Sequence, residues 1–193
     1  MSIKIPKNIK NMEPYKPENY FHKYKGHALK MDWNEYLGKN NDFIINEINS
    51  HLKTDKGKPN YYADLECSVL KDKIAGFLKC DFKAINIYNG SDSALENIYK
   101  TFIDIDDQVI IVGPTYDNAR SMSQFYTKKS TKIFLFPNPF DIDPNTITKL
   151  SNAKCIYICN PNNPTGAIFS KDEIKNILES LPFTLFIIDE AYV

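Results

Sequence analysis

From residue 84 onward, short apolar runs alternate with stretches of helical spacing. None of the runs is long or periodic enough for a helix, so each is predicted to be a buried strand; they lie at 85–88, 109–112, 132–136, 154–159 and 185–188. Apolar residues recur at three- and four-residue intervals between them, which predicts helices at 92–102, 115–125 and 170–181 and a short helix opened by Asp143 and Pro144. Because no hairpin turn joins the strands, we expect an α/β fold with a doubly wound parallel sheet.

The N-terminal part of the chain has a different pattern. Residues 1–40 are rich in Lys, Asn, Tyr and Pro without a sustained period, which predicts an irregular arm that drapes over a neighbour. Ile44, Ile48 and Leu52 lie four residues apart, which predicts a short amphipathic helix over Asn41–Leu52. A second helix is expected from about Asp64 to Lys79, with five side chains facing the core: Leu65, Val69, Ile74, Phe77 and Leu78. We therefore predict an arm and short helix over residues 1–60 and a main domain over residues 61–193.

Polar residues mark the expected helix starts. Asp64 can cap the helix that follows it, because its carboxylate can accept backbone N–H groups of the first turn. The spacing Ser-x-x-Glu is that of a capping box, and it occurs twice, at Ser93–Glu96 and at Ser170–Glu173.

Composition narrows the function classes. The 193 residues contain 24 Lys and Arg against 24 Asp and Glu, with 42% hydrophobic residues, as in an ordinary globular protein. Neither nucleic acid nor a membrane is indicated as a partner, since there is no basic excess, no apolar span and no signal-peptide core; the cytosol is the expected compartment. Four cysteines fit no zinc spacing, so no metal site is predicted, and Cys155 and Cys159 are expected to be buried thiols on one strand face.

Two of the predicted strands end in polar groups. The strand at 154–159 runs into Asn160-Pro-Asn-Asn163-Pro-Thr-Gly166, and the strand at 185–188 runs into Asp189-Glu-Ala-Tyr192. Ligands of open α/β sheets bind at the carboxyl ends of strands, so Asn163 and Asp189 are expected to share one site. A carboxylate such as that of Asp189, directly after four apolar residues, is costly to bury unless it is paired.

A strand that ends in Asp-Glu is also typical of nucleotide hydrolases, in which the Asp orders Mg²⁺. Those enzymes need a Gly-x-x-x-x-Gly-Lys-Ser/Thr loop, and this chain has none. No Gly-x-Gly-x-x-Gly motif occurs either, so the usual dinucleotide fingerprint is missing as well.

The strand-end motifs resemble those of the class I/II (fold type I) pyridoxal-phosphate aminotransferases, most closely the histidinol-phosphate aminotransferase branch. The resemblance rests on Pro161-Asn-Asn-Pro-Thr-Gly166 and Asp189-Glu-Ala-Tyr192, extends to Gly113-Pro-Thr-Tyr116 and Asn89-Gly-Ser-Asp92, and covers nearly the whole chain. It implies pyridoxal 5'-phosphate as the cofactor and a homodimer as the assembly. One departure is Asn34-Glu-Tyr-Leu-Gly38, where the family normally carries Asn-Glu-Asn-Pro.

For the cofactor phosphate, the resemblance implies binding by Ser91 and Asp92 at the start of a helix. Without it, these two residues would be read as a helix cap and Tyr116 as a core aromatic residue. In the family, the tyrosine at the place of Tyr116 stacks on the pyridine ring. Tyr62 resembles the tyrosine that reaches the phosphate of the partner subunit, although Tyr61 remains an alternative.

For the cofactor ring, the resemblance implies catalytic roles for Asp189 and Tyr192. Asp189 would pair with the ring nitrogen and keep it protonated, so that the ring accepts the electrons released at the substrate Cα. Tyr192 and Asn163 would bind the 3-oxygen of the ring. From its own surroundings, Asn163 could equally stabilise its turn.

The implied reaction is the transfer of an amino group between an amino acid, or an amine phosphate, and a 2-oxo acid. Two alternatives stay open: a decarboxylase of a phosphorylated amino acid, and a non-catalytic truncated pseudo-enzyme. The family's Schiff-base lysine lies on a later strand in a Ser-x-x-Lys context that these 193 residues do not contain, so the chain alone is expected to be inactive. In the family, two later strands separate the first strand from the 154–159 strand, which leaves 85–88 detached here. Arg120, the single arginine, is expected to be a solvated helix residue.

Overall fold

The computed structural model describes residues 4–13, 34, 41–54, 60–134, 147 and 152–193. By its contacts the chain divides into two compact units, one formed by residues 1–16 with 88–193 and the other by residues 17–87. No helix within the described ranges has the length and apolar character needed to cross a membrane.

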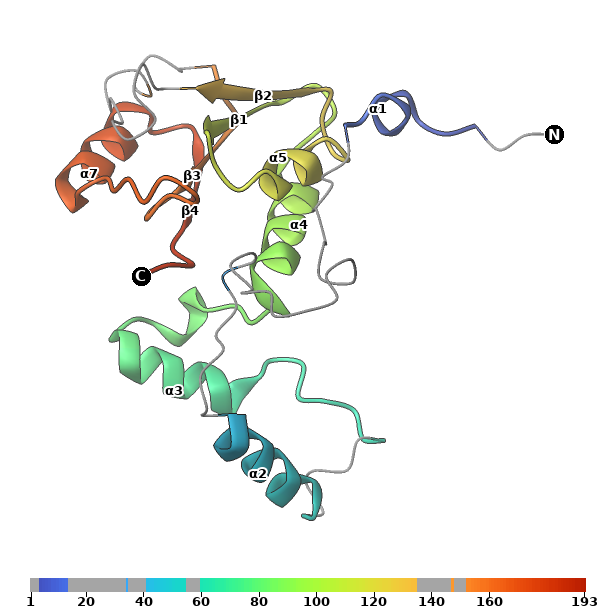
Figure 1. Ribbon diagram of the computed structural model, residues 1–193, viewed down its shortest axis with the longest axis vertical. Helices are drawn as coiled ribbons and strands as arrows, with labels where there is room; N and C mark the ends of the chain where they lie inside the picture. Colours follow the sequence, from blue (N-terminus) through green and yellow to red (C-terminus); the bar gives the residue numbers. More distant parts are fainter. Residues whose placement is uncertain (1–3, 14–33, 35–40, 55–59, 135–146, 148–151) are drawn as a thin grey trace, which may run out of the picture. The chain divides into compact units, whose positions relative to one another are not determined.

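The first unit contains a four-stranded parallel sheet in the order β2-β1-β3-β4 (Figure 1). Its strands are β1 (Gln108–Gly113), β2 (Lys129–Phe134), β3 (Cys155–Cys159) and β4 (Leu185–Asp189). Val109 pairs with Cys155 across β1 and β3, and Cys159 pairs with Asp189 across β3 and β4. This sheet confirms the predicted α/β class, with β2 shifted three residues towards the N-terminus at its start.

Each face of the sheet is covered by helices. Helices α4 (Gly90–Phe102) and α5 (Asn118–Ser123) cover one face, where Leu95, Tyr99 and Ala119 pack on alternate strand residues. Helix α7 (Lys171–Ser180) packs against the other face through Ile177 (Figure 1). Side chains alternate between the two covered faces along each strand, which is why β3 and, after Gln108, β1 are buried and apolar.

The fifth predicted strand is not formed. Residues 85–88 form no ladder with any described strand, although Ile85 is extended (φ −108°, ψ 132°). An extended segment becomes a strand only when its N–H and C=O groups bond to a neighbour. The expectation that 85–88 would be detached from the sheet is therefore confirmed, and its assignment as a strand is wrong.

The structure contains one of the two predicted capping boxes. Ser170 Oγ accepts the N–H of Glu173 at 3.3 Å, and Glu173 Oε2 accepts the N–H of Ser170 at 2.7 Å, so the box before α7 is confirmed. The box at Ser93 is wrong, because α4 begins at Gly90 and Ser93 already lies in its first turn, donating its hydroxyl to the carbonyl of Asn89 at 3.2 Å. Helix α5 is shorter than the predicted 115–125, and the helix predicted at Asp143 and Pro144 lies outside the described residues.

The second unit contains α2 (Asn41–Leu52), α3 (Ser68–Leu78) and the 3₁₀ helix η3 (Phe82–Ala84). The helix predicted at 41–52 is confirmed, and Asp64 accepts the N–H groups of Glu66 and Ser68 at 3.0 and 2.8 Å. The predicted core positions are wrong, because an apolar stripe predicts a helix but not what covers it. Most of those side chains are exposed, as are those of α2: Leu65, Val69, Phe77 and Leu78 in the α3 region, and Ile44, Ile48 and Leu52 in α2.

The described part of the arm packs on its own chain. Helix α1 (Lys7–Lys10) places Asn8 against α5, where its side-chain amide donates to the carbonyls of Gln124 and Phe125 at 3.3 and 3.0 Å. The N–H of Glu13 donates to Gln124 Oε1 at 3.1 Å. The rest of the arm, which is expected to drape over a neighbour, lies outside the described residues apart from Asn34.

Arg120 is not the solvated residue that the sequence suggests. Its side chain is only 12% exposed and forms two bonds to the carboxylate of Asp117, at 3.0 and 2.6 Å. Glu13 adds a weaker ion pair at 3.8 Å. The hydrogen bonds to Asp117 are the main reason that the pKa of Arg120 is raised. Because Arg120 contacts both Asp117 and Glu13, it joins α5 to the arm.

Candidate active site

The candidate site residues of the first unit follow the carboxyl ends of three neighbouring parallel strands. Tyr116 follows β1, Asn163 follows β3, and Asp189 is the last residue of β4. Since β1, β3 and β4 are adjacent and parallel, these ends meet at one edge of the sheet. Gly113 is the last residue of β1, which places Tyr116 three residues beyond the strand.

Both oxygens of the Asp189 carboxylate accept hydrogen bonds. Tyr157 of β3 donates its hydroxyl to Oδ2 at 2.7 Å, and the backbone N–H of Ala191 donates to Oδ1 at 3.1 Å. The backbone carbonyl of Asp189 accepts the N–H of Asn160 at 2.9 Å, which ties the ends of β3 and β4 together. Burial and the neighbouring Asp189 raise the pKa of the Tyr157 phenol, so it stays a donor. The sequence predicts that a carboxylate at this position needs a partner, and these two hydrogen bonds meet part of that need.

Asn163 and Tyr192 lie together. The side-chain amide of Asn163 donates to the hydroxyl of Tyr192 at 3.2 Å, which bridges the loop after β3 and the segment after β4. Asn163 is partly exposed, and Tyr192 is 46% exposed. Both side chains are therefore accessible at the edge where Asp189 ends β4.

Tyr116 is oriented towards the start of α4. Its hydroxyl donates to the carboxylate of Asp92 at 3.4 and 3.5 Å, and Asp92 lies in the first turn of that helix. Gly90 begins the helix with a φ of +83°, a conformation that favours glycine. Ser91 is exposed, and the first N–H groups of a helix have no acceptor inside it, so this turn presents donors and a positive dipole end.

Two further asparagines of the same loop are structural. Asn160 bonds both ways with the backbone of Phe169, at 2.8 and 3.1 Å. Asn162 is only 6% exposed, and its amide donates to the carbonyl of Pro114 at 2.9 Å and to Thr165 Oγ1 at 2.8 Å. These bonds fix the loop against the end of β1 and leave Asn163 to face outwards.

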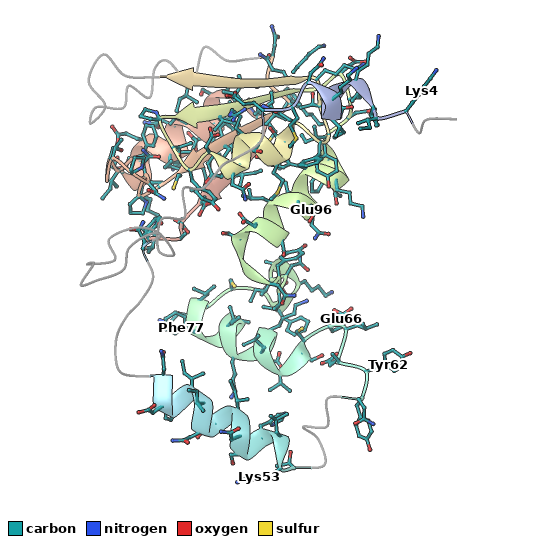
Figure 2. The ribbon with its side chains drawn as sticks, turned by 45° about the vertical axis from the view of Figure 1, so that its right-hand side comes forward. Lys4, Lys53, Tyr62, Glu66, Phe77 and Glu96 are labelled. Carbon is teal, nitrogen blue, oxygen red and sulfur yellow. The ribbon has the colours of Figure 1, made fainter. Side chains whose placement is uncertain are left out.

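Tyr62 lies in the second unit, apart in the chain from the residues above. Its side chain is fully exposed and projects from the segment before α3 (Figure 2). Tyr61 is 59% exposed. The role of Tyr62, and the choice between the two tyrosines, stay predictions.

Sequence reasoning missed Tyr157 as a partner of Asp189. The signal was its place two residues before the end of β3, on the same face as Cys155 and Cys159, but a tyrosine in an apolar strand looks like core packing. Both cysteines are buried and free, as predicted, and burial raises the pKa of Cys155 to about 12. Within the described parts of the chain, no three His, Cys, Asp or Glu side chains gather as metal ligands.

Residues 27–193 match the family Aminotransferase class I and II. The chain belongs to this family. Its members are pyridoxal-phosphate enzymes, as the strand-end motifs imply.

Two curated relatives of this chain are named for small phosphate esters. It is 35% identical over 192 residues to a dihydroxyacetone phosphate transaminase of Campylobacter jejuni, covering 96% of this chain and 52% of that protein. It is 31% identical to a histidinol-phosphate aminotransferase of Buchnera aphidicola, covering 98% of this chain and 51% of that protein. The chain thus spans about half the length of the curated relatives it matches.

Solved structures show the same fold. A histidinol-phosphate aminotransferase of Sinorhizobium meliloti in complex with pyridoxal-5'-phosphate matches with a TM-score of 0.63 at 23% identity, over 75% of this chain and 40% of that one. An L-threonine-O-3-phosphate decarboxylase of Porphyromonas gingivalis matches with a TM-score of 0.62 at 24% identity, over 77% and 45%. At these identities the likeness establishes the fold type I architecture of the aminotransferase chain and nothing finer.

The residues present fit the cofactor of this family. Pyridoxal phosphate needs donors for its phosphate, an aromatic side chain, an acceptor for its ring nitrogen and donors for its 3-oxygen. The first turn of α4, Tyr116, the Asp189 carboxylate and the Asn163–Tyr192 pair supply these groups at one edge of the sheet. The held but partly exposed Asp189 carboxylate is the most specific of these features.

Proposed function

We propose that this chain provides the cofactor-binding part of an aminotransferase that moves an amino group between an amino acid or amine phosphate and a 2-oxo acid. The observation that carries the proposal is the Asp189 carboxylate, held by Tyr157 at 2.7 Å and lying on the same sheet edge as the hydrogen-bonded Asn163 and Tyr192. When bound, pyridoxal phosphate supplies an electron sink for bond breaking at the substrate Cα.

Each residue has a definite task in this proposal. The backbone N–H groups of Ser91 and Asp92, with the Ser91 hydroxyl, bind the phosphate at the start of α4. Tyr116 covers the ring and excludes water from it. Asp189 holds the proton on the ring nitrogen, and its negative charge favours the protonated form of that nitrogen.

Asn163 and Tyr192 complete the site from the other side of the ring. An amide N–H and a phenol O–H can both donate to the 3-oxygen and orient the ring against Tyr116. Their mutual bond at 3.2 Å supports this task, because it holds the two side chains next to each other.

The substrate class follows from what the relatives have in common. The dihydroxyacetone phosphate and histidinol-phosphate enzymes are both named for a phosphate monoester, and they are 35% and 31% identical to this chain. A phosphorylated amine or amino acid is therefore the proposed amino donor. A threonine-phosphate decarboxylase shares the fold, so a decarboxylase of a phosphorylated amino acid is the second candidate.

The proposal is tested by the Asp189→Asn variant of a complete enzyme, in which residues 1–193 are joined to the segment that carries the family's Schiff-base lysine, with pyridoxal phosphate and a panel of amines, with and without a phosphate ester. Amino-group transfer to a 2-oxo acid and release of CO₂ are measured in parallel. Asp189→Asn should still bind the cofactor but lose about a hundredfold or more in turnover, because a neutral amide does not hold the pyridinium proton. Glu190→Gln, at the exposed neighbouring position, is the matched control.

Near-normal turnover in Asp189→Asn would overturn the assignment of Asp189. Release of CO₂ without amino transfer would favour the decarboxylase. Absence of both activities with every amine would leave a non-catalytic binding protein.

A further inference from the structure

The hydroxyl of Tyr157 lies against the carboxylate of Asp189. Tyr157 is fully buried in β3, and its hydroxyl donates to Asp189 Oδ2 at 2.7 Å. Cys159 pairs with Asp189 in the β3–β4 register, so Tyr157 reaches the carboxylate diagonally, on the same face of the sheet. Among the described residues, it is the only side chain that donates to Asp189.

A second buried tyrosine in the same core cluster offers a comparison. Tyr99 of α4 is also 0% exposed and belongs to the same core cluster as Tyr157. Its hydroxyl finds no hydrogen-bond partner within the described structure. The core on this face therefore accommodates a buried phenol by packing alone, and the bond from Tyr157 to Asp189 calls for another explanation.

We propose that Tyr157 is a positioning residue, which fixes one oxygen of the Asp189 carboxylate so that the other oxygen is presented to the ring nitrogen of the cofactor. This inference rests on the proposed function, in which Asp189 pairs with that nitrogen. Oδ1 is shared only with the backbone N–H of Ala191 at 3.1 Å, and a carboxylate oxygen can accept a second donor.

The surroundings of Tyr157 make its hydroxyl a dependable donor. The titratable groups that act on it are Asp189 from β4, Cys159 from β3 and Tyr99 from α4, and none of them is a cation. Burial raises the pKa of the phenol, so the proton stays on Tyr157. A hydrogen bond from a neutral donor to a carboxylate stabilises its ionised form, which keeps the ring proton on nitrogen instead of on Asp189.

The test compares Tyr157→Phe with Tyr99→Phe. Both variants remove one buried phenol hydroxyl from the same core cluster and keep the ring, but only the first removes a bond to Asp189. Three quantities are measured on the complete enzyme that carries the Schiff-base lysine: the dissociation constant of pyridoxal phosphate, the ¹⁵N chemical shift of ring-labelled bound cofactor, and kcat and KM for the amino donor. Tyr157→Phe is also made in the Asp189→Asn background.

Tyr157→Phe should weaken cofactor binding about tenfold and lower kcat by a similar factor, as expected for the loss of a bond to a charged group. The ring ¹⁵N resonance should move towards its unprotonated position. KM for the amine should not change, because Tyr157 is buried behind Asp189. In the Asp189→Asn background the second substitution should add nothing, and Tyr99→Phe should match the unmodified protein in all three measurements.

If Tyr157→Phe behaves like Tyr99→Phe while Asp189→Asn is impaired, the positioning role is overturned and the proposed function stands. The same conclusion follows if the effects of Tyr157→Phe and Asp189→Asn multiply independently. If Asp189→Asn has normal turnover, the proposed function fails and this inference fails with it. Should Tyr157→Phe fold poorly, a double-mutant cycle on unfolding of the cofactor-free protein decides, since zero coupling between Tyr157 and Asp189 would also overturn it.

Discussion

Asn162 and Asn163 are adjacent residues whose side chains face different surroundings. The Asn162 amide is buried and bonds to Pro114 and Thr165, whereas the Asn163 amide lies at the surface and bonds to Tyr192. The alternative that Asn163 only stabilises its turn loses force, because Asn162 and Asn160 already hold the loop. The burial of each side chain and its hydrogen-bond partners therefore distinguish the structural amide of Asn162 from the candidate binding amide of Asn163.

At the residue scale we therefore expect opposite outcomes from the same substitution. Asn162→Ala should lower the free energy of unfolding by about 1–3 kcal/mol, since it leaves buried polar groups without partners. Asn163→Ala should leave stability within about 0.5 kcal/mol and weaken pyridoxal phosphate binding. Urea denaturation and cofactor titration of both variants check this. Equal stability losses would contradict the assignment of the two roles.

The stability of helix α7 depends in part on the capping box at its N-terminus, formed by Ser170 and Glu173. Backbone and side-chain hydrogen bonds with Ser170 lower the pKa of Glu173 below its ordinary value of 4.5. A carboxyl group with a lowered folded-state pKa stabilises the fold above its unfolded pKa and loses that contribution as the pH falls through the folded pKa. The contribution of Glu173 to stability is thus present at neutral pH and disappears in acid below about 4.5.

We predict that Ser170→Ala costs about 1 kcal/mol of stability at pH 7, the usual effect of losing a helix cap. Glu173→Ala should be destabilising at pH 7, and its difference from the unmodified protein should shrink steadily as the pH falls below 4.5. Thermal unfolding at a series of pH values measures both effects. Glu179→Ala removes a carboxylate near the end of the same helix, outside the capping box, and is the control. If the stability difference between Glu173→Ala and the unmodified protein stays constant down to low pH, the capping role is contradicted.

The sequence predicts elements well where a local signal is enough. β1, β3, β4, α2 and α7 were recoverable because apolar runs, spacing and the Ser170 box act within a few residues. The segment at 85–88 was not, since a strand also needs a pairing partner. The same limit applies to the site: the motifs pointed to Asn163, Asp189 and Tyr192, but the bond from Tyr157 depends on the β3–β4 register.

The homodimer that the family resemblance implies can be tested through Tyr62. This residue is fully exposed in the second unit, and the resemblance assigns it to the cofactor phosphate of the partner subunit. In the complete enzyme, Tyr62→Ala and Asp189→Asn should each have low activity alone. When they are mixed and re-associated, hybrid dimers should regain one intact site, giving about a quarter of full activity for random pairing.

Hybrid formation is verified with two different affinity tags, and Tyr61→Ala in place of Tyr62→Ala is the control. If hybrids form but no activity returns, Tyr62 acts within its own subunit or not at all. Recovery with Tyr61→Ala instead would assign the role to Tyr61.

Covalent attachment of the cofactor to residues 1–193 requires a lysine within the candidate site. A lysine that binds pyridoxal phosphate covalently must lie at the sheet edge where Asp189 ends β4. Among the described residues, the segments that follow β1, β3 and β4 and the start of α4 contain no lysine: 89–92, 113–118, 159–168 and 189–193. Lys129 begins β2 and Lys154 directly precedes β3, so both lie at the opposite edge.

The purified 193-residue chain should therefore show only scattered, low-level lysine labelling when it is incubated with pyridoxal phosphate, reduced with borohydride and mapped by mass spectrometry. Asp189→Asn should leave that pattern unchanged, because incidental labelling of surface lysines does not depend on the site. A single lysine labelled in equal amount to the chain, and lost in Asp189→Asn, would contradict this. It would mean that one of the 23 lysines reaches the edge of the sheet beside Asp189 and that the chain carries its own attachment residue.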